Sequence, residues 1–192
     1  MALIVNTLSR DEITNLRGLI GATFDSLAGA HLPDYLSGSE VLLVTDRGVL
    51  RIWSEVTGLD FQGFDEDYST LHVAIGDNGL DEATRLGHRY YIHSGERIDD
   101  VEIVREIVSE VVIGEATWEY CSDIAIMLKL SGGSLTLRRE HLNMEVLSVR
   151  FADVGAVTGV PTPTSYWSDT VDTRYVTERI VLPVDVLLRE AD

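Results

Sequence analysis

Histidine and acidic side chains are the residues of this chain with the clearest capacity for chemistry. His88 and His93 form the closest histidine pair, and Glu96 follows them. Two metal ligands on one element must lie on the same face. A spacing of five places the two rings on opposite faces of a strand, and well apart on a helix. We therefore expect no metal ion here, and interpret both histidines as polar positions on a sheet surface.

The acidic run Asp65, Glu66 and Asp67 invites comparison with a calcium-binding loop. Such a loop needs oxygen ligands at alternate positions, a central glycine and a late bidentate glutamate. Neither Asp60 nor Asp65 begins a stretch with that pattern. We interpret the run as a solvated, charged loop, and treat its three side chains as candidate contacts for a partner.

The sequence gives no catalytic motif. It contains no Gly-x-Ser-x-Gly elbow, no phosphate-binding loop and no dinucleotide fingerprint. Cys121 is the only cysteine, and its aromatic, acidic setting opposes thiolate formation, so we expect a small, buried hydrophobic residue. A carboxylate pair for glycoside hydrolysis stays open, since 32 acidic residues give no means of selecting two. We expect no cofactor, and no catalytic residue can be named.

Tyr166 and Trp167 lie in a proline-containing stretch, residues 161–168. Aromatic side chains are over-represented in binding hot spots, whereas an exposed Trp is unfavourable in a soluble monomer. Two alternatives therefore stay open: the rings are tucked over the core, which we favour, or they are displayed to a partner. Both residues join the acidic run as candidate partner contacts.

The strong negative charge of the chain limits the classes of partner. The formal net charge is -17, with 32 acidic against 15 basic residues. This excess disfavours nucleic acid and anionic membranes, and attracts a basic protein, unless the acids serve only for solubility. No apolar run is long enough to span a bilayer, and the first residues lack the basic region of a signal peptide. With a single cysteine, these features predict a cytoplasmic protein.

The same strand-turn-strand pattern occurs twice, in residues 40–52 and 123–137. Residues 20–25 and 113–119, which lie upstream of the two copies, also match with one insertion. We predict an internal duplication, with a first β-rich half at 1–81 and a second at 82–192, packed as one unit.

Other elements follow from local signals. Ser9 and Glu12 form a capping-box pattern ahead of a short helix with Ile13 and Leu16 on one face. Gly48 is placed to adopt a positive φ angle in the first hairpin turn. We predict strands at residues 3–8, 22–28, 71–75, 89–93, 141–151 and 175–182, a loop at 57–69, a helical turn at 81–86 and an irregular link at 155–163. Residues 98–113 fit either period and are interpreted as extended with a break, and 184–188 fit helix or strand.

We therefore predict an α+β protein that is predominantly β, with two related β-meander or hairpin halves and one short N-terminal helix. Hairpins of this kind in an acidic, single-cysteine chain resemble small bacterial immunity or inhibitor proteins. This likeness concerns architecture and does not imply function. The leading hypothesis is a non-enzymatic, protein-binding module, inhibitor-like or immunity-like, whose acidic surface engages a basic partner or forms a homo-oligomer. The alternatives are an enzyme whose carboxylates converge in a cleft between the halves, and a purely structural subunit.

Overall fold

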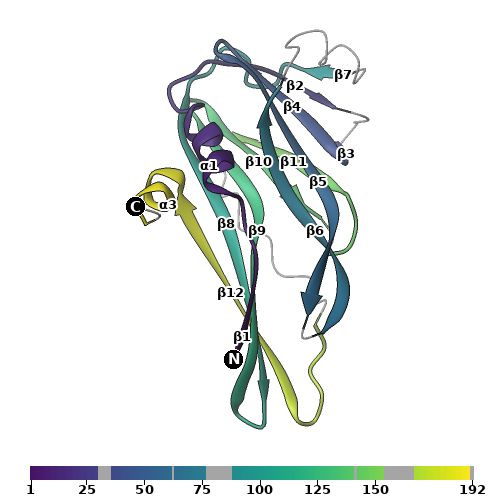
Figure 1. Ribbon diagram of the computed structural model, residues 1–192. Coiled ribbons are helices and arrows are strands. Elements are labelled where there is room, and N and C mark those ends of the chain that lie inside the picture. The colour runs from purple at the N-terminus through teal and green to yellow at the C-terminus, as the bar shows by residue number, and fades with distance from the viewer. Residues whose placement is uncertain (30–35, 62, 77–87, 141, 154–166, 191–192) are drawn as a thin grey trace.

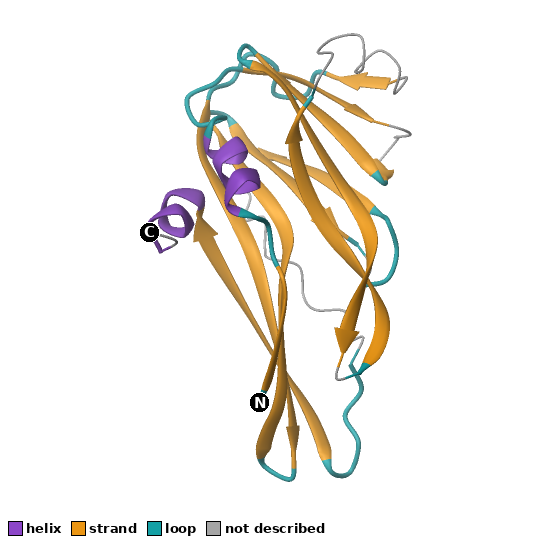
Figure 2. Ribbon diagram, viewed as in Figure 1, coloured by secondary structure: helices purple, strands orange, loops and turns teal. Residues whose placement is uncertain are grey.

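The computed structural model describes residues 1–29, 36–61, 63–76, 88–140, 142–153 and 167–190 (Figure 1). This part of the chain is predominantly β-structure in two packed sheets, with a short helix near each terminus (Figure 2). The predicted fold class is confirmed. Neither described helix has the length and apolar character needed to cross a bilayer.

The larger sheet has seven strands in the order β12-β8-β9-β10-β11-β3, and β1 pairs with β9 beside this path. The pairing of β1 with β9 is parallel, and every other pairing in the sheet is antiparallel. The strands are β1 (Ala2–Asn6), β3 (Leu36–Gly38), β8 (Ile98–Val112), β9 (Glu115–Leu130), β10 (Gly133–Arg139), β11 (Leu147–Asp153) and β12 (Thr173–Pro183).

The smaller sheet has five antiparallel strands in the order β6-β5-β4-β2-β7. They are β2 (Phe24–Gly29), β4 (Glu40–Thr45), β5 (Gly48–Phe61), β6 (Phe64–Ile75) and β7 (His88–Tyr90). The main core contains buried side chains from both sheets and from both helices, α1 (Arg10–Arg17) and α3 (Val184–Glu190).

Helix α1 begins where the sequence predicts. The Ser9 side chain accepts a hydrogen bond from the Glu12 amide, and the Glu12 carboxylate accepts one from the Ser9 amide at 2.7 Å. The buried side chains of Ile13 and Leu16 anchor one face of the helix in the core. The helix therefore combines a satisfied N-terminus with an apolar stripe, the two features that the sequence shows.

Both predicted hairpins form. The turn between β4 and β5 has Gly48 at φ 129°, as expected, and the turn between β9 and β10 falls at Ser131 and Gly132. The two hairpins lie in different sheets. Strands β1 and β3, from the predicted first half, pair with β9 and β11 of the second half. Strand β7, from the predicted second half, pairs with β2 of the first half. The duplication itself stays a prediction.

The predicted loop at residues 57–69 is wrong. Strands β5 and β6 stay paired up to Phe61 and Phe64, so this segment is the end of a long hairpin. Its Gly and Asp residues lower the intrinsic strand preference, but packing decides strand formation more than propensity does. Tyr68 is buried at 5% exposure and Leu59 packs against the same aromatic cluster, which holds the hairpin in place.

The remaining predicted elements differ mainly in their ends. The 98–113 segment is extended, as strand β8, with register shifts at three points. The 175–182 strand is confirmed as β12, which ends at Pro183, and 184–188 are helical in α3. Strand β11 starts only at Leu147, and β7 ends at Tyr90 because a turn follows. The predicted helical turn at 81–86 and link at 155–163 lie outside the described residues.

Candidate functional site

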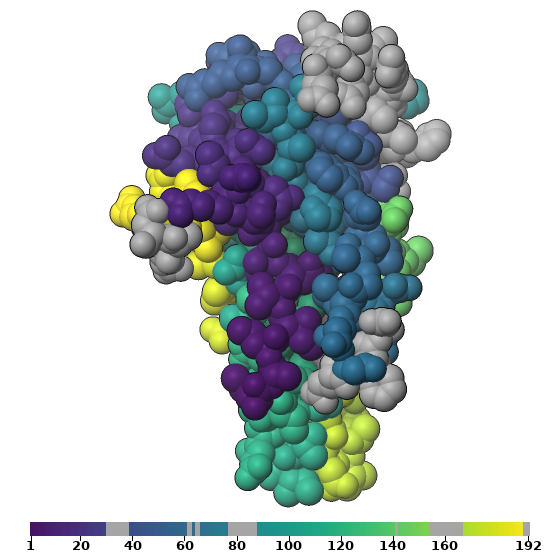
Figure 3. All heavy atoms as spheres, viewed as in Figure 1, coloured from purple at the N-terminus to yellow at the C-terminus, as the bar shows by residue number. Residues whose placement is uncertain are grey.

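One end of the molecule gathers three segments that are far apart in sequence. They are residues 55–67, at the tip of the β5–β6 hairpin, residues 110–119, around the β8–β9 turn, and residues 167–178, which lead into β12. All three lie toward the lower end of the view in Figure 1. In Figure 3 the molecule narrows toward this end, where the β8–β9 turn and the start of β12 lie side by side. We call these residues the acidic end.

The charge of the acidic end is strongly one-sided. The three segments contain five, three and three acidic residues, and Arg174 is their only basic residue. The exposed acids are Glu55, Asp60, Glu66, Asp67, Glu115, Asp169, Asp172 and Glu178. Within the described chain, none of these side chains forms an ion pair with Lys, Arg or His.

Acids in the rest of the described molecule are commonly paired. Glu40 accepts two hydrogen bonds from Arg51, at 2.8 and 3.0 Å, and the Asp25 carboxylate lies 2.8 Å from the Arg89 guanidinium. Buried Asp123 accepts from Arg105 at 2.8 Å. The fold therefore neutralises many carboxylates, whereas the exposed ones at the acidic end have no cationic partner among the described residues.

A cluster of aromatic rings lies beneath these charges. The Trp167 ring lies 5.2 Å from Trp118 and 5.4 Å from Tyr175, centroid to centroid. Trp118 is buried at 3% exposure, whereas Trp167 and Tyr175 are half-buried. Trp167 is thus packed against Trp118 and Tyr175 and is partly exposed.

The carboxylate of Glu110 is hydrogen-bonded to the aromatic cluster. The Tyr175 hydroxyl donates to Glu110 at 3.1 Å, and the Thr117 hydroxyl donates to the other carboxylate oxygen. Burial, followed by the bond to Glu110 and its charge, raises the pKa of Tyr175. Tyr175 therefore stays a neutral hydrogen-bond donor in ordinary conditions, and its ring is held in one orientation.

Two further rings fix the β5–β6 hairpin to the larger sheet. Tyr68 lies 5.1 Å from Tyr120, and Asn6 donates to the Tyr120 hydroxyl at 2.9 Å and to the Ser69 carbonyl at 3.2 Å. Burial, with a smaller contribution from the charge of Glu66, raises the pKa of Tyr68 to about 12. These contacts place the acids at the hairpin tip at a defined position relative to β9.

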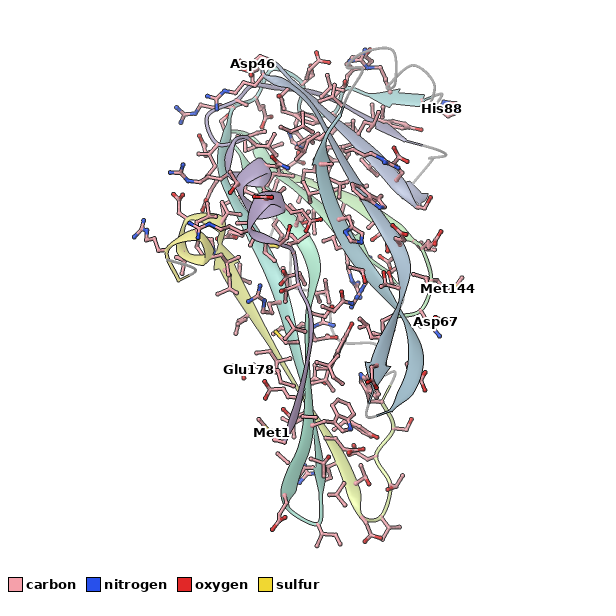
Figure 4. All side chains as sticks on the ribbon, in the orientation of Figure 1. Met1, Asp46, Asp67, His88, Met144 and Glu178 are labelled. Carbon is pink, nitrogen blue, oxygen red and sulfur yellow. The ribbon has the colours of Figure 1, made fainter. Side chains whose placement is uncertain are left out.

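Of the candidate partner contacts predicted from the sequence, all but Tyr166 lie among the described residues. Glu66 and Asp67 are exposed residues of β6, and Figure 4 labels Asp67 on the outside of the hairpin. Asp65 is in the same strand, opposite Asp60. Trp167 belongs to the aromatic cluster, and Tyr166 lies outside the described residues. The acidic run and Trp167 therefore belong to the same end of the molecule.

A groove that shares Glu55 with the acidic end bears on the enzyme alternative. Its volume is about 260 Å³, and Glu40, Glu55 and Glu145 contribute to its lining beside Arg51 and Trp53. Glu40 is bound by Arg51, while Glu55 and Glu145 accept bonds from the Trp53 indole and the Val56 amide at 3.3 and 3.4 Å. Carboxylates do converge here, but all three already accept hydrogen bonds within the chain.

The other candidate chemical groups are engaged elsewhere. His93 Nδ1 lies 2.8 Å from Glu96, and His88 packs against Tyr90 instead. Among the described residues, no three His, Cys, Asp or Glu side chains are placed to hold a metal ion. Cys121 is half-buried, and its burial raises the thiol pKa, which disfavours the reactive thiolate.

Sequence reasoning found the acidic run but missed the acids around the β8–β9 turn and before β12. A usable signal was present, since residues 52–84, 106–128 and 151–173 contain no Lys or Arg. Only the fold shows that parts of these stretches meet at one end. Comparisons with protein-family models, curated proteins and solved structures gave no match for this chain.

Proposed function

We propose that this protein is a non-enzymatic protein-binding module, with an inhibitor-like or immunity-like role in the cytoplasm, and that its acidic end receives a basic protein partner. One observation carries the proposal: the exposed acids at this end have no cationic partner within the described chain. A basic surface supplies the missing charges. Acids elsewhere, such as Asp25 and Asp123, already have an arginine partner.

The arrangement suits rapid and specific association. A concentrated field of one sign steers an oppositely charged protein and raises the association rate, most strongly at low ionic strength. The half-buried rings of Trp167 and Tyr175 add apolar contact area within the charged surface. Both rings are already held in place by packing, so little conformational freedom is lost on binding.

The same field affects self-association. Two acidic ends repel each other, so a homo-oligomer has to use another surface of the molecule. We therefore expect that two copies of the free protein do not associate through their acidic ends. We also expect that added salt weakens binding of the basic partner at this end.

The test compares two double variants that remove the same charge at different places. Asp67→Asn with Asp172→Asn neutralises two exposed acids of the acidic end, and Asp11→Asn with Asp153→Asn neutralises two exposed acids elsewhere. Binding to a panel of small basic proteins is measured by surface plasmon resonance at about 20 and 150 mM salt. We expect the first double variant to associate about tenfold more slowly than wild type at low salt, and the second less than twofold.

Two results would refute the proposal. Equal effects of the two double variants would show that only net charge matters, without a localised surface. Absence of salt-sensitive binding to any basic protein, with the folded wild type, would remove the acidic end as a binding site. Circular dichroism of all variants verifies that the comparison is made between folded proteins.

A further inference from the structure

A cavity lies at the other end of the smaller sheet, next to the β4–β5 turn. Its volume is about 730 Å³. Figure 4 labels Asp46, which contributes to its lining, at the top of the view, opposite the acidic end. Pockets of this size accept small organic ligands, and the best ones combine an apolar floor with a few polar groups.

The floor of this cavity is apolar. Val44 and Val49 line it, and they pack with Ala28 and Leu42 in a buried cluster that is separate from the main core. These four side chains are at most 7% exposed. The sheet therefore has apolar residues on both faces here, because Val41 and Leu43 of the same strand point into the main core.

One rim is a turn held in an unusual conformation. In the turn after β7, His93 has φ 60° and Gly95 has φ 88°. A left-handed conformation is rare for a residue other than glycine and persists only when its surroundings fix it. Here Glu96 lies 2.8 Å from His93 Nδ1 and accepts from the Gly132 amide at 2.6 Å, while the Gly95 amide donates to the Phe24 carbonyl at 2.7 Å. The rim is thus formed before any ligand arrives.

Among the described residues that line the cavity, one negative charge is uncompensated. The Arg89 guanidinium is satisfied by Asp25 at 2.8 Å and by the Ser26 hydroxyl. Asp46 accepts a hydrogen bond from the Thr23 amide at 2.8 Å, and no cationic side chain in the described chain pairs with it. With two carboxylates and one guanidinium in the lining, the site favours a cation over an anion.

We propose that this cavity binds a small organic amine: a primary ammonium group attached to an apolar body. The apolar body lies on Val44 and Val49, and the ammonium group faces the Asp46 carboxylate. Tyr91, which is 59% exposed at the rim, covers one side of the ligand. This site is independent of the acidic end and of the protein-binding function proposed for it.

The test uses three six-carbon probes that differ only in the head group: hexylamine, hexanol and hexanoate. Each is titrated into the ¹⁵N-labelled full chain at about 150 mM salt, and amide shifts are followed by NMR. We expect hexylamine to shift the amides of residues 44–49 and 91–95. Hexanol should bind severalfold more weakly, and hexanoate at least tenfold more weakly.

Matched variants separate this site from general attraction to a negative protein. Asp46→Asn keeps an oxygen for the Thr23 amide but loses the charge, so hexylamine should bind about fivefold more weakly while hexanol is unaffected. Asp67→Asn removes the same charge at the acidic end and should leave hexylamine binding at residues 44–49 unchanged. Tyr91→Ala should weaken both hexylamine and hexanol.

Three results would overturn the proposal. They are equal binding of hexanoate and hexylamine, shifts that follow the exposed acids instead of the cavity, and equal effects of Asp46→Asn and Asp67→Asn. The NMR spectrum of each free variant shows directly whether it is folded, so a loss of binding can be assigned to the site.

Discussion

Replacing Glu12 should weaken the contact between helix α1 and the edge of the smaller sheet. One carboxylate oxygen of Glu12 accepts from the Ser9 amide and hydroxyl, both at 2.7 Å. The other accepts from the Val73 amide at 3.0 Å and lies 3.2 Å from His72 Nδ1. Strand β6 is an edge strand, so Glu12 both caps the helix and occupies a backbone donor that would otherwise be open to another strand.

The magnitude follows from the pKa of the carboxyl group. Burial alone raises the pKa of Glu12, but the hydrogen bonds from His72, Ser9 and Val73 together outweigh it and lower the pKa from 4.5 to about 2. Each unit of difference between folded and unfolded protein corresponds to about 1.4 kcal/mol. Since the side chain is only 17% exposed, we expect the ionised form to contribute about 2–3 kcal/mol to the free energy of unfolding.

The pH dependence has a definite direction. A carboxyl group with a lowered folded-state pKa stabilises the protein above its unfolded pKa of 4.5, and this contribution is lost as the pH falls toward about 2. Glu12→Gln should therefore be about 2–3 kcal/mol less stable than wild type at pH 7. The difference between the two proteins should shrink steadily between pH 4.5 and pH 2.

The assay is urea unfolding of wild type and Glu12→Gln from pH 7 to pH 2, with Asp11→Asn as the control. Asp11 is an exposed acid in the same first turn, so its replacement removes the same charge near the helix N-terminus without the contacts to β6. We expect the control to cost less than about 1 kcal/mol. Equal costs of the two substitutions at pH 7, or a difference that does not change with pH, would refute the assigned role of Glu12.

Three further predictions concern the turn, the aromatic cluster and the net charge. Gly48→Val should lower stability by about 1 kcal/mol or more in thermal unfolding, because a β-branched residue resists the φ of 129°; an unchanged melting temperature would contradict the assigned strain. Because the pKa of Tyr68 is raised to about 12, its neutral form stabilises the fold below pH 10, and this contribution disappears as the pH rises to 12. Unfolding measurements should thus show that Tyr68→Phe loses less stability than wild type between pH 10 and pH 12. If the free energy of unfolding fell equally with pH in the two proteins, the hydroxyl would not be buried. Finally, with a net charge of -17, melting followed across a sodium chloride series should show stability rising from very low salt to about 0.15 M, and a flat series would mean that the acids do not repel one another appreciably.

Local signals in the sequence predicted the elements that depend on a few neighbouring residues. The capping box of Ser9 and Glu12 and the turn at Gly48 are examples. They succeed because their hydrogen bonds or dihedral angles are set within four or five residues. Strand β12 was also found, over residues 175–182 of its observed range Thr173–Pro183.

Long-range packing decided the elements that the sequence did not predict. Residues 57–69 look like a loop, yet Tyr68 meets Tyr120 across the sheets and the hairpin stays paired to its tip. In β9 the register shifts between Asp123 and Ala125, so Ile124 has no partner in β8, and side chains on either side belong to different clusters. A bulge of this kind cannot be recognised from alternation alone.

The candidate site also combines a feature that is visible in the sequence with neighbours that only long-range packing brings together. The acidic run at 65–67 is visible in the sequence, whereas its neighbours at the β8–β9 turn and before β12 come from segments more than 40 residues away. The same holds for the cavity beside Asp46, whose rim combines strands β2, β4 and β5 with the turn after β7. Residue types indicate the chemistry, but only the topology brings them together.

The acidic end concentrates exposed acids that have no cationic partner among the described residues. Two like charges 10 Å apart in water repel by about 0.4 kcal/mol, so crowding exposed acids on one narrow end disfavours the free protein at low salt. The same acids would be stabilising if each faced an arginine, as Asp123 faces Arg105. Arg174 is instead the only basic residue of the three segments, and the rings of Trp118, Trp167 and Tyr175 pack together there. A basic partner would remove that repulsion on binding, so a surface that weakens the free protein would strengthen the complex.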